Sequence, residues 1–211
     1  MVYNFYDYWY HIFMGHTIPK KTLQALYINK QQSAHDIALE TGCSEQKIHY
    51  WLRKYKIPKR SISEAIYIKH NPGGDPFAIK DIKTMKDALL FGIGVGLYWG
   101  EGTKSNTHAI RLGNTDPRLM RKFIVFLKIL YGVQKDQLRF GLQVFSDMDP
   151  RKALLYWCRE LGAMHSQFQK VVVTQARSIG TYRKKSQYGV LTVYYHNKKL
   201  RDILCNTIDS L

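Results

Sequence analysis

The sequence is poor in cysteine, and its three cysteines are scattered at Cys43, Cys158 and Cys205. Their odd number and wide spacing fit neither a zinc site nor a disulfide framework, which is typical of proteins from a reducing cytoplasm. The eight histidines form no H-E-x-x-H or cysteine–histidine array, and no glycine-rich loop follows a strand pattern as a phosphate cradle requires. The sequence therefore carries none of these catalytic signatures, and it predicts no small-molecule substrate.

Long hydrophobic runs are missing as well. The longest apolar run lies between Asp87 and Glu101 and spans about a dozen residues, whereas a bilayer requires roughly 20. The aromatic N-terminus, MVYNFYDYWYHIF, lacks the positively charged region and the small-residue cleavage site of a signal peptide. We therefore expect a cytoplasmic protein without a membrane partner, whose N-terminus packs on the body of the molecule.

Acidic residues are scarce: 32 lysines and arginines stand against 16 aspartates and glutamates, for a net charge of +16. Such an excess favours a polyanionic partner, most commonly nucleic acid, over a merely solvated basic surface. With 211 residues, 45% of them hydrophobic and 23% charged, the chain is expected to be globular and to form one medium domain or two small ones.

The first third of the chain has the residue pattern of a helix-turn-helix. A helix capped by Ser33 is predicted through Glu40, Gly42 allows the chain to reverse, and Ser44 caps the next helix. Ala38, Ile48 and Trp51 stand where apolar side chains lock the two helices together. The alternative is a plain three-helix bundle with a charged outer face.

In a helix-turn-helix the second of these helices enters the major groove of double-stranded DNA. Gln46 suits adenine edges, and Lys47 and Arg53 suit guanine or phosphate. The basic tail that follows, including Lys56, Lys59 and Arg60, suits phosphates. The residues expected to contact DNA here are Ser44, Glu45, Gln46, Lys47, His49, Tyr50, Arg53 and Lys54.

Turn-forming residues mark a domain boundary after this unit. The run Asn71–Pro76, NPGGDP, is typical of a linker. We therefore predict a DNA-binding domain at residues 1–66, a linker at 67–83 and a second domain at 84–211. Residues 66–211 carry a net charge of +12, so we expect the second domain to contact DNA as well.

The second domain begins with a glycine-rich apolar helix that includes Phe91–Gly102, FGIGVGLYWGEG. Thr84 is placed to cap its start, and its last residue is a glycine in the position of a C-cap. Each interior glycine costs about 1 kcal/mol relative to alanine. Gly92, Gly96 and Gly100 share one face because they repeat every four residues, and a face without side chains lets another helix approach closely.

The segment Gly94–Gly102, GVGLYWGEG, resembles the signature of the LAGLIDADG homing endonucleases. Glu101 falls on the acidic position at the end of that motif, and Gly96 and Gly102 fall on its glycines. Glycine replaces the first leucine of the motif, and Trp99 replaces its earlier acidic residue. The residues that follow and also look like the family are Arg111, Asn114, Asp116 and Pro117.

The resemblance implies an α+β domain with a four-stranded sheet and helices on one face. The residue pattern predicts two helices that begin with Asp-Pro and end at glycine, at 116–131 and 149–161, and a final amphipathic helix capped by Asn197. The last two of the four strands are expected to form a hairpin. The predicted strands are 104–114, 137–145, 169–175 and 189–196.

The resemblance also implies how the domain would act. In the family two motif helices pack along a pseudo-twofold axis, and the acid at the end of each binds a divalent metal above the DNA. Because this chain has one motif, it would form a homodimer and hold Mg²⁺ through Glu101 and Gly100. Lys104, or a residue of the run 183–185, would supply positive charge near the phosphate. The alternative for Glu101 is a structural salt bridge. The residues expected at the dimer interface are Gly92, Gly96, Leu97 and Gly100.

A basic loop with tyrosines, residues 176–188, joins the last two predicted strands and suits a phosphate backbone with a base or sugar to stack on. A solvated hairpin loop is the alternative. The residues expected to contact DNA in the second domain are Lys104, Arg111, Arg177, Tyr182, Arg183, Lys184 and Lys185.

Two functions are predicted from these features. The first is a sequence-specific, homodimeric and magnesium-dependent DNA endonuclease of homing type. The second is a DNA-binding transcriptional regulator that keeps the fold without cutting, because some bacterial regulators resemble this fold with its acids lost. RNA binding or a role in splicing, which some relatives of the family perform, is a further alternative.

Overall fold

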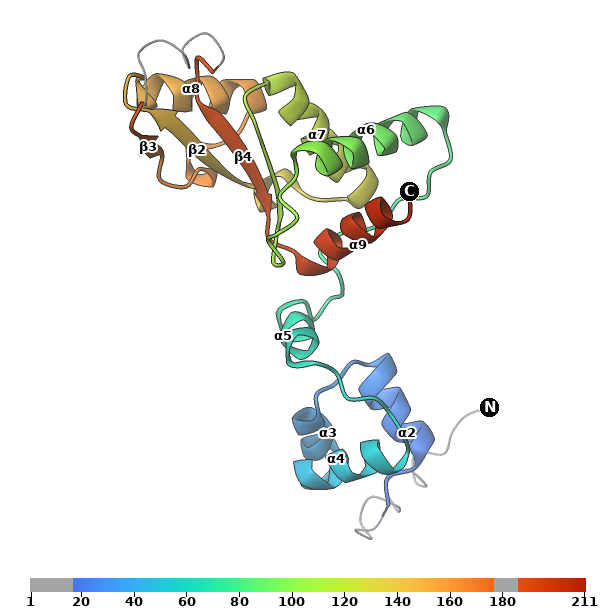
Figure 1. Ribbon diagram of the computed structural model, residues 1–211. Coiled ribbons are helices and arrows are strands. Elements are labelled where there is room, and N and C mark those ends of the chain that lie inside the picture. Colours follow the sequence, from blue (N-terminus) through green and yellow to red (C-terminus); the bar gives the residue numbers. More distant parts are fainter. Residues whose placement is uncertain (1–16, 177–185) are drawn as a thin grey trace. The chain divides into compact units, whose positions relative to one another are not determined.

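The computed structural model describes residues 17–176 and 186–211. The chain divides into two compact units between Asp75 and Pro76 (Figure 1). The first unit is helical, and the second combines helices with a sheet.

The first unit packs three helical segments around one apolar core. The helix α2, Lys20–Gln24, continues directly into a π-helical turn, η1, Ala25–Asn29. It is followed by α3, Ala34–Thr41, and α4, Glu45–Lys54. The buried residues that form this core are Ile18, Leu23, Leu26, Tyr27, Ala34, Ile37, Ala38, Ile48, Trp51, Leu52 and Ile57.

Local capping chemistry sets the ends of α3 and α4. Ser33 Oγ accepts a hydrogen bond from the Asp36 amide at 3.0 Å, and the Asp36 carboxylate accepts one from the Ser33 amide at 3.1 Å. The Ser33 hydroxyl also donates to the Asp36 carboxylate at 2.6 Å, and this bond, together with that from the Ser33 amide, lowers the pKa of Asp36. Gly42 ends α3 in the left-handed conformation, with φ 65°, and Ser44 caps α4. The predicted caps are therefore confirmed at all three positions.

A helix that the sequence did not predict, α5, spans Ile62–His70 and crosses the boundary expected between residues 66 and 67. None of its residues is buried within the described part of the chain. Beyond Pro76, the segment expected to be a linker packs on the second unit. Phe77 enters the apolar core there, and the amide of Ala78 donates to the Tyr131 carbonyl at 2.9 Å. Burial of one aromatic ring and pairing of the backbone explain why this stretch is ordered.

The second unit is α+β. In its described residues it contains a four-stranded mixed sheet in the order β1-β4-β2-β3. The strand β4 runs antiparallel to both β1 and β2, and β3 runs parallel to β2. Its elements are α6 Met85–Glu101, β1 Ile110–Asn114, α7 Pro117–Tyr131, η2 Lys135–Gln137, β2 Arg139–Phe145, α8 Pro150–Leu161, η3 His165–Gln167, β3 Val172–Thr174, β4 Val190–Tyr195 and α9 Lys198–Asp209.

The prediction that the last two strands form a hairpin is wrong. β4 lies between β1 and β2, and β3 pairs with the far side of β2 (Figure 1). The burial pattern explains the order. Leu191 and Val193 of β4 are buried as a central strand requires, whereas Val172 and Val173 of the three-residue β3 are exposed, as suits an edge.

The first strand is also shorter than predicted, because it begins at Ile110 rather than at residue 104. The side chain of Asn106 makes the difference. Its Oδ1 accepts hydrogen bonds from the amides of His108 and Ala109 at 2.9 and 3.0 Å. An asparagine side chain that satisfies the backbone in this way favours a turn over a ladder.

One face of the sheet is buried and the other is open. Side chains that alternate along the strands, such as Leu112, Phe140, Leu142 and Val193, are buried in the core with residues of α6, α7, α8 and α9. The two predicted Asp-Pro helices are confirmed: Asp116 and Asp149 cap α7 and α8, and glycines in the left-handed conformation end them. In the part of the chain that the structure describes, no helix is both long and apolar enough to cross a membrane.

Candidate functional site

The glycines of α6 are of two kinds. A Cβ on Gly94 would lie 2.1 Å from the ring of Phe126, so this glycine allows α6 to approach α7 closely. Among the described residues, a Cβ on Gly92, Gly96 or Gly100 would meet no atom within 4 Å beyond the backbone of its own helix. The predicted glycine face therefore points away from the core of its own unit.

An exposed apolar stripe runs along this open face of α6. Met85, Leu89 and Trp99 are 85%, 64% and 55% exposed. With Gly92 and Gly96 they follow a spacing of four, three, four and three residues, which keeps them on one side of a helix. Leu97, which was also expected at an interface, is instead partly buried against the core of its own unit.

The end of α6 is joined directly to the sheet. Gly102 adopts an extended conformation, with φ −76° and ψ 142°, rather than the left-handed one of a typical C-cap. A Cβ there would lie 2.3 Å from the carbonyl oxygen of Tyr98, so close approach requires the glycine. Gly102 then forms a bridge to Leu112 of β1, and the amide of Thr103 donates to the Arg111 carbonyl at 2.9 Å. The sequence thus places Glu101 beside the first strand.

Glu101 is exposed at the C-terminus of α6. Within residues 17–176 and 186–211, its carboxylate has no hydrogen-bond or ion-pair partner, which argues against the structural salt bridge considered as the alternative. A carboxylate at a helix C-terminus is electrostatically unfavourable. The exposed carboxylate is therefore available to a cation from outside the chain.

The neighbouring Lys104 has a structural contact. Its Nζ donates to the carbonyl of Trp99, one of the carbonyls left unpaired at the end of α6. Arg201 of α9 donates through Nη2 to the carbonyl of Lys104 and through Nη1 to Asp202 at 2.9 Å. Arg201 and Lys104 together fix the loop that follows Glu101.

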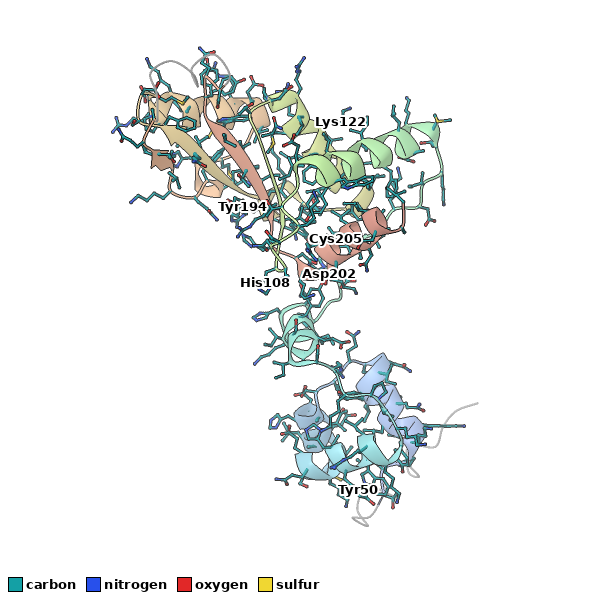
Figure 2. All side chains as sticks on the ribbon, viewed as in Figure 1. Tyr50, His108, Lys122, Tyr194, Asp202 and Cys205 are labelled. Carbon is teal, nitrogen blue, oxygen red and sulfur yellow. The ribbon has the colours of Figure 1, made fainter. Side chains whose placement is uncertain are left out.

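A buried tyrosine lies beneath this loop. Tyr98 is fully buried, and burial is the main cause that raises its pKa to about 12. The charged end of Arg201 and the thiol of Cys205 lie near its hydroxyl. Figure 2 shows Asp202 and Cys205 on α9, in the same region as His108 of the loop after α6. The tyrosine therefore stays neutral at physiological pH and packs in the hydrophobic core of the second unit.

The open face of the sheet is cationic and carries an aromatic platform. The guanidinium of Arg111 lies 5.1 Å from the ring centroid of Tyr194, which is labelled in Figure 2. Gly141 leaves room for that ring, because a Cβ there would lie 2.9 Å from the tyrosine hydroxyl. Arg139 and Gln143 are exposed on the same face of β2. Such a face can contact phosphates through its arginines and present a ring for stacking.

Of these residues, the sequence prediction named only Arg111. The other residues of the open face could have been predicted from the alternation of polar residues along the strands, because residues two apart on a strand share a face. The residues that were missed are Arg139, Gln143 and Tyr194.

The outward face of α4 contains most of the side chains expected there. Gln46 and Arg53 are exposed, and Tyr50 is half-exposed. Lys54 lies over the ring of Trp51, with its Nζ 4.6 Å from the ring centroid. Lys47 is partly buried, and Ser44 uses its hydroxyl to cap the helix.

Two histidines flank Glu45. The Glu45 carboxylate lies 3.7 Å from His35 Nδ1 and 3.5 Å from His49 Nε2. These contacts become ion pairs only when the imidazoles are protonated. Through these contacts Glu45 interacts with side chains of its own unit rather than with a ligand.

Arg60, expected to reach a phosphate, is used inside the first unit. Its guanidinium donates to the carbonyls of Tyr27, Gln31 and Gln32 at 2.6, 2.9 and 2.6 Å, and it lies 4.1 Å from the Tyr27 ring centroid. A guanidinium with these partners has little capacity left for a ligand. The expected phosphate contact is therefore replaced by a structural one.

Five predicted DNA contacts lie outside the described residues. They are Arg177, Tyr182, Arg183, Lys184 and Lys185.

Oxygen atoms suited to a hard cation are present at the end of α6. One chain offers the Glu101 carboxylate, and the carbonyl of Gly100 is adjacent in sequence. No group of three histidines, cysteines or acids in the described ranges is placed to hold a metal by itself. Mg²⁺ commonly binds through one or two carboxylates and keeps waters and phosphates as its other ligands. The donor set therefore fits Mg²⁺ only with further ligands from outside one chain.

Comparisons of this chain with models of protein families, with curated proteins and with solved structures found no match. Function is therefore inferred from the residues and their geometry.

Proposed function

We propose that the protein is a sequence-specific DNA-binding protein that acts as a homodimeric, metal-dependent DNA endonuclease of homing type. The observation that carries this proposal is Glu101. Its side chain is an unpaired carboxylate at the end of α6, a helix with an exposed apolar face. The bridge between Gly102 and Leu112 joins this end of the helix to the sheet, whose open face is cationic.

The open stripe of α6 supports dimerisation. Met85, Leu89 and Trp99 expose apolar surface at core-like spacing, and Gly92 and Gly96 leave room for a second helix. Two copies of α6 packed on this face would bury the stripe and bring two Glu101 carboxylates towards one axis. Like charges brought close together repel each other unless a cation lies between them.

DNA binding is proposed to involve both units. In the first unit, α3, the turn at Gly42 and α4 act as a helix-turn-helix, and Gln46 and Arg53 face the major groove. In the second unit the open sheet face, with Arg111, Arg139 and Tyr194, contacts the duplex. A net charge of +16 supports both contacts.

Mg²⁺ would be held by Glu101, with the carbonyl of Gly100 as a further ligand. When bound, such an ion activates water and stabilises charge on a phosphate. Glu101 would bind and orient the ion. Lys104, held against the Trp99 carbonyl, adds positive charge at the same helix end and is in turn fixed by Arg201.

A second candidate function is a DNA-binding transcriptional regulator that does not cut. One observation favours it. In the portion of the chain that is described, Glu101 has no second acid grouped with it into a metal site. A regulator needs only the binding faces and the dimer.

Purified protein incubated with a plasmid library separates the two candidates. The endonuclease predicts nicked or linear plasmid in Mg²⁺ and intact plasmid in EDTA. The regulator predicts retention of particular plasmids without cleavage in either condition. A protein that neither cuts nor retains any plasmid would contradict both candidates.

The contact of the open sheet face is tested with a matched pair of variants. Arg139→Ala removes a cation from the open face, whereas Lys122→Ala removes one from the exposed side of α7. Loss of one phosphate contact lowers the slope of log K against log salt by about 0.9. We expect this change for Arg139→Ala and the parent slope for Lys122→Ala. Equal slopes for both variants would argue against the open face.

A further inference from the structure

A basic pocket follows the C-terminal end of α4. It has a volume of about 500 Å³ and is lined by Arg53, Lys56, Ile57, Pro58 and Lys59. Its lining therefore contains three cationic side chains and no acidic one. Ile57 is buried in the core of the unit, and its amide donates to the Leu52 carbonyl at 2.9 Å, so the pocket has a fixed floor.

Lys56 has an unusual backbone conformation. Its φ is 55°, in the left-handed region that a side chain with a Cβ rarely adopts. The same conformation ends α3, α7 and α8, and each of those helices uses glycine there, at Gly42, Gly132 and Gly162. After α4 the chain instead has a lysine where glycine would be less strained.

Gln31 has the same φ, so the conformation alone assigns no function; a lysine held in it, within a pocket that Arg53 and Lys59 also line, points to a role for its charge. We propose that Lys56 completes a phosphate-binding pocket with Arg53 and Lys59, and that the ligand is a backbone phosphate of duplex DNA. This inference rests on the proposed DNA binding. The pocket continues the exposed side of α4 through Arg53, which belongs to both. Its phosphate would fix the register of α4 in the groove, because phosphate contacts position a DNA-binding protein.

A simpler role for these cations is to stabilise the C-terminus of α4, where positive charge is electrostatically favourable. The two roles make opposite predictions for Lys56→Gly. If the lysine serves only the helix end, its removal lowers stability and leaves DNA binding unchanged. If it serves a phosphate, glycine relieves strain while binding weakens.

The experiment uses the full chain and a random-sequence duplex of about 30 base pairs. For Lys56→Gly we expect an equal or higher melting temperature, weaker binding, and a slope of log K against log salt that is smaller by about 0.9, as one lost phosphate contact requires. Lys56→Gln removes the charge but keeps a side chain at this φ. It should show the same loss of slope without the gain in melting temperature.

Gln31 provides a matched control, because it is exposed, uncharged and held at φ 56°. Gln31→Gly should raise the melting temperature as Lys56→Gly does and leave the salt slope at the parent value. A drop in slope for Gln31→Gly would overturn the inference, because the effect would then belong to the backbone.

The remaining outcomes are also decisive. If the parent binds the duplex and both Lys56 variants keep its slope, the pocket proposal fails while the proposed DNA binding stands. If the parent does not bind duplex DNA, both fail. If the slope changes on single-stranded RNA of the same length and not on the duplex, the assignment of the phosphate to DNA is overturned.

Discussion

The guanidinium of Arg60 is bound within the first unit. Arg60 stands in a basic run that suits phosphates, yet its guanidinium bonds to the carbonyls of Tyr27, Gln31 and Gln32 and packs over an aromatic ring. It therefore ties the segment after α4 to the end of the first helix. The sequence shows a basic run, but the fold determines which of its cationic side chains form hydrogen bonds within the chain.

Arg60→Ala is expected to lower the free energy of unfolding by about 2–4 kcal/mol, because hydrogen bonds to a charged group are lost and carbonyls are left unpaired. Arg60→Lys should not restore the parent value, since an ammonium cannot reproduce the fork of a guanidinium. Urea denaturation measures both. Lys59→Ala, at the exposed neighbouring position, is the control and should change stability little. An Arg60→Ala protein as stable as that control would contradict the structural role.

Gly94 shows a different constraint at the scale of the residue. Its neighbour Phe126 is fully buried, so the ring has no space into which to move from the 2.1 Å contact that a Cβ would make. Gly94→Ala should therefore destabilise the protein by about 1–3 kcal/mol through overpacking.

Gly92→Ala is the matched comparison on the same helix. The added Cβ meets no atom within 4 Å, and replacing glycine by alanine favours the helix by about 1 kcal/mol. The melts are made at protein concentrations low enough for the monomer to dominate, because Gly92 faces the second helix in the proposed dimer. Under these conditions the melting temperatures of the two variants should move in opposite directions. If both variants melted alike, the proposed packing of α6 on α7 would be wrong.

At the scale of the element, α6 presents one face to its own unit and one to solvent. The outward face carries exposed apolar side chains separated by Gly92 and Gly96. A monomer gains nothing from this pattern, because interior glycines weaken the helix and exposed apolar groups are poorly solvated. A second copy of the helix would bury the side chains and use the glycines for close approach.

Gly96→Leu is expected to dissociate the dimer, because the new side chain occupies the space of the second helix. The folded monomer should survive, since nothing in its own unit lies within 4 Å of the new Cβ. Sedimentation velocity compares the parent, Gly96→Leu and Lys128→Leu, in which the same side chain is added to the exposed face of α7. A Gly96→Leu protein that sediments and melts like the parent would rule out this arrangement.

Local chemistry explains which elements could be predicted. The caps at Ser33, Ser44, Asp116 and Asn197 depend on a side chain and an amide two or three residues away, so the sequence is sufficient. Strand pairing depends on contacts far apart in the chain. The three-residue β3 gives no signal of whether it pairs with β2 or β4, and the hairpin prediction failed there.

The candidate site follows the same division. Glu101 and the glycine face were predicted because both belong to one continuous motif. Tyr194 and Arg139 were missed because the open face is assembled from strands that are neighbours only in the fold. Arg111 was predicted from a motif, while its position over the Tyr194 ring depends on the pairing of β1 with β4.

At the scale of the whole molecule, both units contain basic surfaces next to secondary structure that suits a duplex. The first has the exposed side of α4 and the basic pocket at its end. The second has the open sheet face beside Glu101. A protein with two such faces is expected to recognise a longer DNA site than either unit could alone, and a dimer would double it.

The most direct measurement compares the parent with Glu101→Gln in one pair of assays, Mg²⁺-dependent cleavage and DNA binding. Glutamine keeps the shape of the side chain and removes its charge. Glu64→Gln, at an exposed position of α5, is the control for loss of a carboxylate. We predict that the parent and the control cut, that Glu101→Gln does not, and that its binding persists or tightens because a negative charge near the phosphates is gone. A Glu101→Gln protein that cuts DNA at the parent rate would contradict the proposed metal site.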